Sequence, residues 1–289
     1  MITTMNTSVN QTFDWSRFTA TLRKELVENK RAILFTLLGT YGLLTMIMIL
    51  GNLGTGSSPD VHETLKYYMP QKLVYMFLSF AIIIVASLAF RKLTNKTGRI
   101  EMFTSPSSML EKFLVNALIY VIGYIVAFFI CAQLADFTRI AVLWFFQDEY
   151  FFVPGPINFL NLIPDAVDGF GIGSAAEIQV DPTKWMTINL MIGLLAGPGL
   201  FLLGSIVWPR LSLLKTFAAV YGIQTIIGII IMIVAVNIDM ESTGWWIINH
   251  MEQIMIGMTI FTVFQLILYW GLSWYLFKRK DVISLKWWK

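Results

Sequence analysis

The chain has 289 residues, of which 56% are apolar and only 13% are charged, and its mean hydropathy is +0.67. Soluble globular domains carry about 25% charged residues, so this chain has too little charge to cover a water-soluble body of its size. The 22 phenylalanines exclude a disordered chain, and a lone cysteine excludes a disulfide scaffold. The composition therefore predicts a polytopic membrane protein.

The first apolar run is preceded by a polar N-terminal segment, residues 1–31, that contains a predicted amphipathic helix. Trp15, Phe18, Leu22 and Leu26 recur at helical spacing, and basic residues occupy the other faces. Such a helix is suited to lie in the plane of the membrane interface. Two interpretations stay open for this interface helix: a simple lipid-surface anchor, or an arm that positions a cytoplasmic partner.

Six stretches of the sequence are long and apolar enough to cross a bilayer, which requires about 20 residues per helix. None of the six contains Asp, Glu, Lys or Arg. The predicted spans are residues 32–51, 73–90, 113–135, 185–208, 216–236 and 254–277. We therefore expect an all-α membrane protein, in which residues 32–289 form a six-helix transmembrane bundle.

The basic residues of the connections predict the orientation of the bundle. The N-terminal segment, the connection 91–112, the turn after the fourth span and the C-terminal tail hold 17 of the 21 Lys and Arg residues. The opposite side holds 12 of the 18 acidic residues, most of them in a long outer loop, 136–184. The positive-inside rule then places both termini in the cytoplasm.

The polar groups within the predicted spans are neutral amides. They are Asn116, Gln133, Asn189, Gln224 and Gln265. Ion-coupled carriers usually hold ionisable groups in the membrane, so the amides argue against transport driven by an ion gradient. Either they form hydrogen bonds between helices or they line a pathway.

The cytoplasmic connection 91–112 has the features of a structured element. Ser108 and Glu111 have the spacing of a helix capping box, and Pro106 marks a turn just before it. The connection also places apolar side chains among basic ones, at Ile100, Met102, Phe103 and Met109. These residues favour a docking surface over an ordinary solvated loop that leads into a helix.

Small residues in the fourth predicted span favour a close helix contact. Gly193 and Gly197 form a G-x-x-x-G pair, and Pro198 is expected to kink or interrupt the helix. Helix packing within the chain, a dimer contact and a gate are the alternatives for these residues.

The order of parts resembles the ABC transporter type-2 permeases, the membrane halves of ATP-driven exporters. The stretch 103–113, Phe-Thr-Ser-Pro-Ser-Ser-Met-Leu-Glu-Lys-Phe, is similar to the family's Leu-Pro-Ala-Ser/Thr…Glu-Lys-Phe segment after span two. Further matching segments are 22–26, 201–205 with Arg210 and Lys215 after it, and 277–282. Two features depart from the family: Ser105 stands where an apolar residue is common, and loop 136–184 has no counterpart.

The resemblance implies a permease subunit that pairs with a second permease subunit, in a homodimer or heterodimer, within the lipid bilayer of the inner membrane. A separate cytoplasmic ATP-binding-cassette ATPase would dock on the interface helix and on the connection 91–112. The residues assigned to this coupling surface are Arg99, Glu101, Ser105, Pro106, Ser108, Glu111 and Lys112. The chain has no G-x-x-x-x-G-K-[ST] motif, so ATP and Mg would bind to the partner, and no cofactor to this chain.

Two other classes of function remain as alternatives. A non-transporting scaffold or sensor subunit would share all of these features. An intramembrane hydrolase is less favoured, because His62 and His250 belong to no H-E-x-x-H pair and Ser174 lacks the second glycine of a nucleophile elbow. No catalytic residue, metal site or nucleic-acid interface is predicted.

Overall fold

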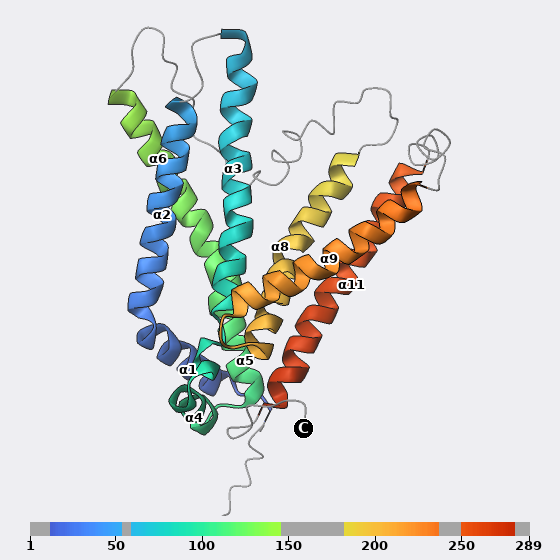
Figure 1. Cartoon of the computed structure of the whole chain (residues 1–289). Helices are drawn as coiled ribbons and strands as arrows, with labels where there is room; N and C mark the ends of the chain where they lie inside the picture. Colours follow the sequence, from blue (N-terminus) through green and yellow to red (C-terminus); the bar gives the residue numbers. More distant parts are fainter. Residues whose placement is uncertain (1–11, 54–58, 146–181, 237–249, 281–289) are drawn as a thin grey trace, which may run out of the picture.

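The computed structural model describes residues 12–53, 59–145, 182–236 and 250–280, and within these ranges the regular structure is entirely helical. The long helices are α2 (Lys30–Leu53), α3 (Pro59–Ser87), α6 (Tyr124–Phe145), α8 (Pro182–Val207), α9 (Ser212–Val236) and α11 (Met251–Lys278). The short ones are α1 (Trp15–Glu28), η1 (Arg91–Thr94), α4 (Lys96–Thr104), α5 (Met109–Ala117) and η2 (Leu118–Gly123). α2, α3 and α6 stand together, α8, α9 and α11 form a second group, and the short helices gather at one end (Figure 1).

Five helical segments in the described ranges are long and apolar enough to cross a membrane. They are Lys30–Gly51, Met109–Phe145, Lys184–Val207, Ser212–Ile230 and Met251–Lys278. The second predicted span coincides with a shorter apolar stretch of α3, Leu73–Ser87. The expected class, an all-α membrane protein, is confirmed, and five of the six predicted spans correspond to such segments.

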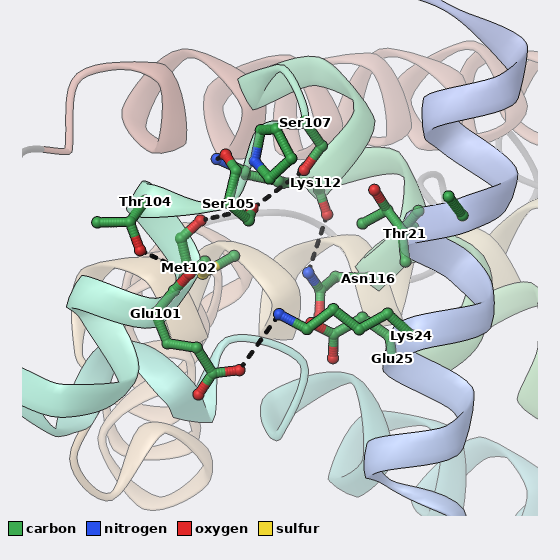
Figure 2. A pocket seen from close by; sticks show the side chains of 13 residues that line it. Thr21, Lys24, Glu25, Glu101, Met102, Thr104, Ser105, Ser107, Lys112 and Asn116 are labelled. Carbon is green, nitrogen blue, oxygen red and sulfur yellow. Dashed lines mark hydrogen bonds and ion pairs between the residues drawn. The ribbon is translucent and has the colours of Figure 1, made fainter.

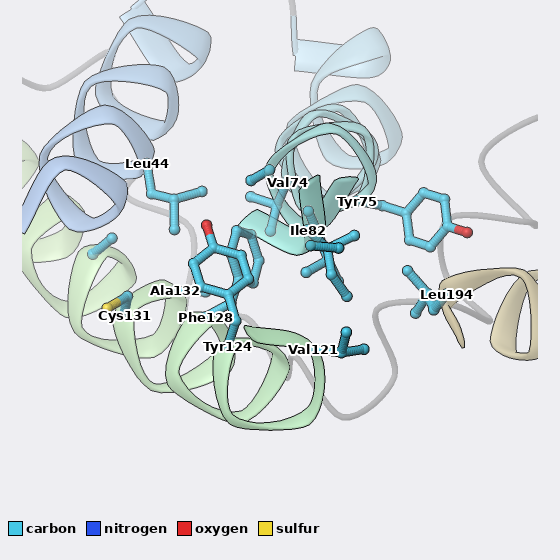
Figure 3. Close-up of a cluster of buried hydrophobic side chains, with 14 of the residues drawn as sticks. Leu44, Val74, Tyr75, Ile82, Val121, Tyr124, Phe128, Cys131, Ala132 and Leu194 are labelled. Carbon is cyan, nitrogen blue, oxygen red and sulfur yellow. The ribbon is translucent and has the colours of Figure 1, made fainter. Parts of the chain in front are cut away.

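The first group of helices meets in an apolar core. Leu44 of α2, Ile82 of α3 and Phe128 of α6 are buried against one another, and Leu194 joins them from α8 (Figure 3). The hydroxyl groups of Thr40 and Tyr124 add a hydrogen bond of 3.1 Å between α2 and α6. Lipid tails are as apolar as this core, so close van der Waals packing and such hydrogen bonds hold the helices together.

The third predicted span extends further than expected, which corrects the boundary of the outer loop. α6 continues to Phe145, so the first ten residues assigned to loop 136–184 are helical, and residues 182–184 belong to α8. The helix therefore contains two charged residues, Asp136 and Arg139, although no charge was expected within this helix. They lie three positions apart on one face, and their side chains form a fully buried ion pair of 2.7 Å. Because each charge neutralises the other, the helix need not end before them.

The helix that contains the third span also changes its winding. η2, a π-helical segment, lies between α5 and α6 and was not expected from the sequence. Gly123 ends this segment, and a β-carbon at this position would lie 3.0 Å from the carbonyl oxygen of Leu118. A side chain there would be crowded against the preceding turn.

Close approaches along α8 occur at other glycines than the predicted pair. A β-carbon at Gly193 or Gly197 would meet no atom within 4 Å among the described residues outside its own turn, whereas one at Gly199 would lie 2.6 Å from the indole nitrogen of Trp270 in α11. At Gly204 the β-carbon would overlap Thr216 of α9. Helix contacts of the described part of α8 thus depend on Gly199 and Gly204, and a dimer contact or gate at the predicted pair stays a prediction.

Pro198 does not interrupt α8, which runs from Pro182 to Val207 through the proline. The indole N–H of Trp270 donates a hydrogen bond of 3.0 Å to the carbonyl oxygen of Leu195, in the turn before the proline. A proline ring weakens backbone bonding in that turn. A donor from a neighbouring helix compensates for this loss, as is common in membrane proteins.

We expect G199A and G204A to destabilise the protein by about 1–3 kcal/mol, because a methyl group overpacks a filled contact. The matched variants G193A and G197A place the same methyl group in open space, so their stability should equal or slightly exceed that of the wild type. Thermal unfolding of the detergent-solubilised chain, followed by tryptophan fluorescence, measures both pairs. Equal effects in the two pairs would contradict this account of α8.

Candidate functional site

The candidate site is a platform formed by residues 12–28 and 91–112, which lie together at one end of the bundle (Figure 1). Its first component, α1, begins at Asp14, whose carboxylate accepts a hydrogen bond of 3.1 Å from the backbone N–H of Arg17. A carboxylate at this position satisfies one of the free N–H groups of the first turn. Phe18 then faces inward and is buried, while Trp15 on the neighbouring face is 69% exposed.

Glu111 ties α1 to the first turn of α5. Its carboxylate is fully buried and accepts hydrogen bonds of 2.8 Å from the backbone N–H groups of Ser108 and Asp14, and one of 3.1 Å from Arg17. Ser108 completes the expected capping box and also donates to the carbonyl oxygen of Thr12. A residue predicted as a helix cap is thus also a long-range junction between two segments.

Lys92 makes a second junction, between η1 and the C-terminal half of α1. Its ammonium group donates to Glu25 at 2.8 and 2.9 Å and to Glu28 at 2.9 Å. Glu101 lies 3.5 Å from the same ammonium group and 3.7 Å from that of Lys24. Burial disfavours the charge of Lys92, but the hydrogen bonds to the two carboxylates outweigh burial and raise its pKa.

A cleft of about 310 Å³ lies between α1 and the α4–α5 segment (Figure 2). Lys112 crosses its floor and donates a hydrogen bond of 3.1 Å to the carbonyl oxygen of Ser105, and Asn116 donates to the carbonyl oxygen of Lys112. The polar side chains that line it include Thr21, Lys24, Glu25, Glu101, Ser105 and Lys112. The cleft offers both signs of charge and several hydroxyl groups, so it is suited to a polar segment of protein.

The structure brings the predicted coupling residues into one region but gives them different environments. Those that line the cleft are Glu101, Ser105, Pro106 and Lys112. Arg99, Glu111 and Lys112 are buried, so little of these side chains is open to a partner. The side chain of Glu101 is 46% exposed and lies at the rim.

The apolar residues of the predicted interface helix are divided between the inside and the outside of the platform. Phe18 packs inward against the rings of Phe13 and Trp15, with centroid distances of 5.7 and 5.5 Å. Leu26 is 42% exposed and Val27 is 57% exposed, so this side of α1 presents apolar surface outward. An apolar strip of this kind is suited to the membrane interface.

The sequence did not single out several residues that hold the platform together. Asp14, Arg17, Glu25, Glu28 and Lys92 belong to this group. Two local signals were available: Asp14 directly before the helical repeat is a typical N-cap, and two carboxylates three positions apart would attract a basic connection.

We expect K92M to loosen α1 by about 1–2 kcal/mol, because three neighbouring carboxylates then lose their shared cation. Local opening of α1 should rise by roughly 5–30-fold. Limited trypsin cleavage after the exposed Arg23 measures this opening. K96M removes an exposed lysine that makes no ion pair among the described residues, and serves as the control. Equal cleavage rates in the two variants would argue against the junction.

The junction at Lys92 has a defined pH window. Burial raises the pKa of Glu28, but hydrogen bonding to Lys92 holds this pKa below 4.5. The contribution of Glu28 to stability is therefore present above pH 4.5 and is lost as the pH falls through the lowered pKa. Because the pKa of Lys92 is raised, its contribution to stability is complete below pH 10.5. This contribution is lost only as the pH rises through the raised pKa. Spin labels at Arg23 and Thr97 should therefore report a constant distance between about pH 5 and about pH 10. In stronger acid the distribution of distances should broaden.

The chain matches no protein-family model, and no curated protein or solved structure is significantly similar to it. The fold defines the class of protein: a membrane-embedded all-α protein with a folded platform at one end of its helices.

Proposed function

We propose that this chain is the permease subunit of an ATP-binding-cassette transporter, an exporter with six spans and both termini in the cytoplasm. The observation that supports this function is the platform itself. Two segments are joined by Glu111 and Lys92, through bonds between residues 67 to 97 positions apart, around a polar cleft at one end of an apolar bundle. A bundle that only anchored a protein would need no such junctions.

The platform has a mechanical connection to the membrane helices. Glu111 lies in the first turn of α5, and α5, η2 and α6 follow one another without a loop from Met109 to Phe145. A force that moves α1 and α4 is therefore transmitted to a helix that crosses the whole bundle. A cytoplasmic ATPase with ATP and Mg in its own site would supply this force.

Burial separates two roles among the coupling residues. Glu101, Pro106 and the neighbouring Thr104 and Ile100 are exposed, and in this proposal they contact the ATPase. Glu111, Lys112 and Ser108 hold the shape of the docking surface from behind. Ile100 is 42% exposed, which adds an apolar anchor beside the charged rim.

A second permease subunit is supported by the polar groups of α9. Gln224 lies at the midpoint of this helix, its side chain is exposed, and its amide has no hydrogen bond among the described residues. An amide at the centre of a bilayer is stabilised by a partner, and two such amides can each donate to the other across a twofold axis. The proposed dimer would supply that partner.

A photo-crosslinking amino acid at Thr104, which is exposed and lines the cleft, tests the docking of an ATPase. In native membranes we expect one major adduct whose sequence contains the G-x-x-x-x-G-K-[ST] motif. The control position is Leu211, which is 71% exposed but lies outside the platform, and it should give no such adduct. A Thr104 adduct with a protein that lacks the motif would contradict the exporter and favour the scaffold or sensor.

A further inference from the structure

A cluster of aromatic rings joins α4 to the C-terminal end of α11. The rings of Phe103 and Phe277 stack with their centroids 6.4 Å apart, and Phe277 also contacts Phe90 at 4.8 Å and Phe113 at 5.9 Å. Phe277 is fully buried in this cluster. The end of α11 is therefore held against the platform, beside the face of α4 that carries Phe103.

This contact holds α4, which carries Arg99, against the end of α11, which leads into Lys280. Arg99 lies one helical turn before Phe103 on the same face of α4, and Lys280 follows Phe277 by three residues. Arg99 is only 8% exposed, and its buried Nε has no hydrogen-bond partner among the residues that the structure describes. Arg99 and Lys280 take part in none of the ion pairs formed by the described residues.

The nearby carboxylates and cations have other partners. Glu101 lies beside Lys24 and Lys92, and Glu111 pairs with Arg17. Arg279, directly before Lys280, instead lies 4.2 Å above the ring of Tyr275. Burial and, to a smaller extent, the positive charge of Arg99 lower the pKa of Lys280, and neither cation forms an ion pair with a carboxylate of the described residues.

We propose that Arg99 and Lys280 bind a phosphate group, either that of an anionic phospholipid or free inorganic phosphate. A buried guanidinium group presents a planar fork of donors that matches phosphate oxygens, and an ammonium group adds a point charge. The site lies where α11, a helix long enough to span the membrane, ends beside the platform, and this is the level at which lipid headgroups are found. The inference requires that α11 cross the membrane, and it does not depend on an ATPase.

The experiment measures which lipid the solubilised full chain retains. The chain is equilibrated with equal amounts of phosphatidylglycerol and phosphatidylcholine, purified again, and its retained lipids are quantified by mass spectrometry. We expect enrichment of phosphatidylglycerol in the wild type and a loss of roughly tenfold in R99Q/K280Q. R99K/K280R keeps both charges and should retain the enrichment. R210Q/K215Q removes two exposed cations from the same end of the bundle and should retain most of it.

A parallel titration with inorganic phosphate, followed by tryptophan fluorescence, distinguishes the two sources of the phosphate group. Saturable phosphate binding that is lost in R99Q/K280Q, without lipid enrichment, supports a site for the free anion. Equal phosphatidylglycerol retention in R99Q/K280Q and in R210Q/K215Q, together with no phosphate binding by the wild type, would overturn the proposal. The single variant K280Q gives the same comparison if the double variant fails to fold. Because no ATPase is present, these outcomes are independent of the proposed transport function.

Discussion

Replacing Glu111 by alanine should detach α1 from α5 and destabilise the chain by about 2–4 kcal/mol. The carboxylate is fully buried and accepts from two backbone N–H groups and from Arg17. E111A removes the carboxylate half of the capping box and leaves all three donors without their acceptor. Thermal unfolding in detergent should show a clear decrease in the midpoint, and hydrogen exchange should show opening of residues 15–28.

E111Q serves as the matched control. The amide oxygen can still accept from the backbone N–H of Ser108, but the charge that pairs with Arg17 is lost, so we expect an intermediate decrease. Unchanged stability and unchanged exchange of α1 in E111A would show that the junction does not hold the platform together.

Asp136 and Arg139 are expected to give the second large effect. Both side chains are fully buried, and the guanidinium group contacts the carboxylate at 2.7 and 2.8 Å. D136L leaves the positive charge of Arg139 buried without this carboxylate and should destabilise the chain by about 3–5 kcal/mol. Unfolding in increasing dodecyl sulfate, followed by circular dichroism, measures the change.

The double variant D136L/R139L decides whether the loss comes from an uncompensated charge. It removes both charges and fills the space with apolar side chains, so it should recover most of the stability that the single variant loses. If the double variant is no more stable than D136L, the loss does not come from an uncompensated charge. Other contacts of Asp136 and Arg139 would then explain why the two side chains are buried.

Local sequence patterns predicted the features that depend on neighbouring residues. The apolar runs gave the helices, and Ser108 with Glu111 gave a capping box that the structure contains. The repeat of Trp15, Phe18, Leu22 and Leu26 likewise predicted a helix, which the structure contains as α1. Each of these features depends on hydrogen bonds or burial within a few helical turns.

Features that depend on distant residues were not predicted. The Asp14–Glu111 contact joins positions 97 residues apart, and no local pattern indicates it. The continuation of α6 through Asp136 depends on a pair of charges that neutralise each other, whereas the predicted span ends at residue 135, directly before the first of them. The close glycines of α8 are Gly199 and Gly204 because Trp270 and Thr216 lie opposite them, and their partners are on other helices.

The most direct test of the central claim is the rate of ATP hydrolysis by the ATPase crosslinked at Thr104. The ATPase is purified and measured in lipid vesicles alone, with the wild-type chain and with E111A. The account predicts that the wild-type chain changes the rate severalfold and that E111A, whose platform is loosened, restores the rate of the ATPase alone. An ATPase whose rate is the same in all three samples would contradict the claim that the platform couples this membrane protein to ATP hydrolysis.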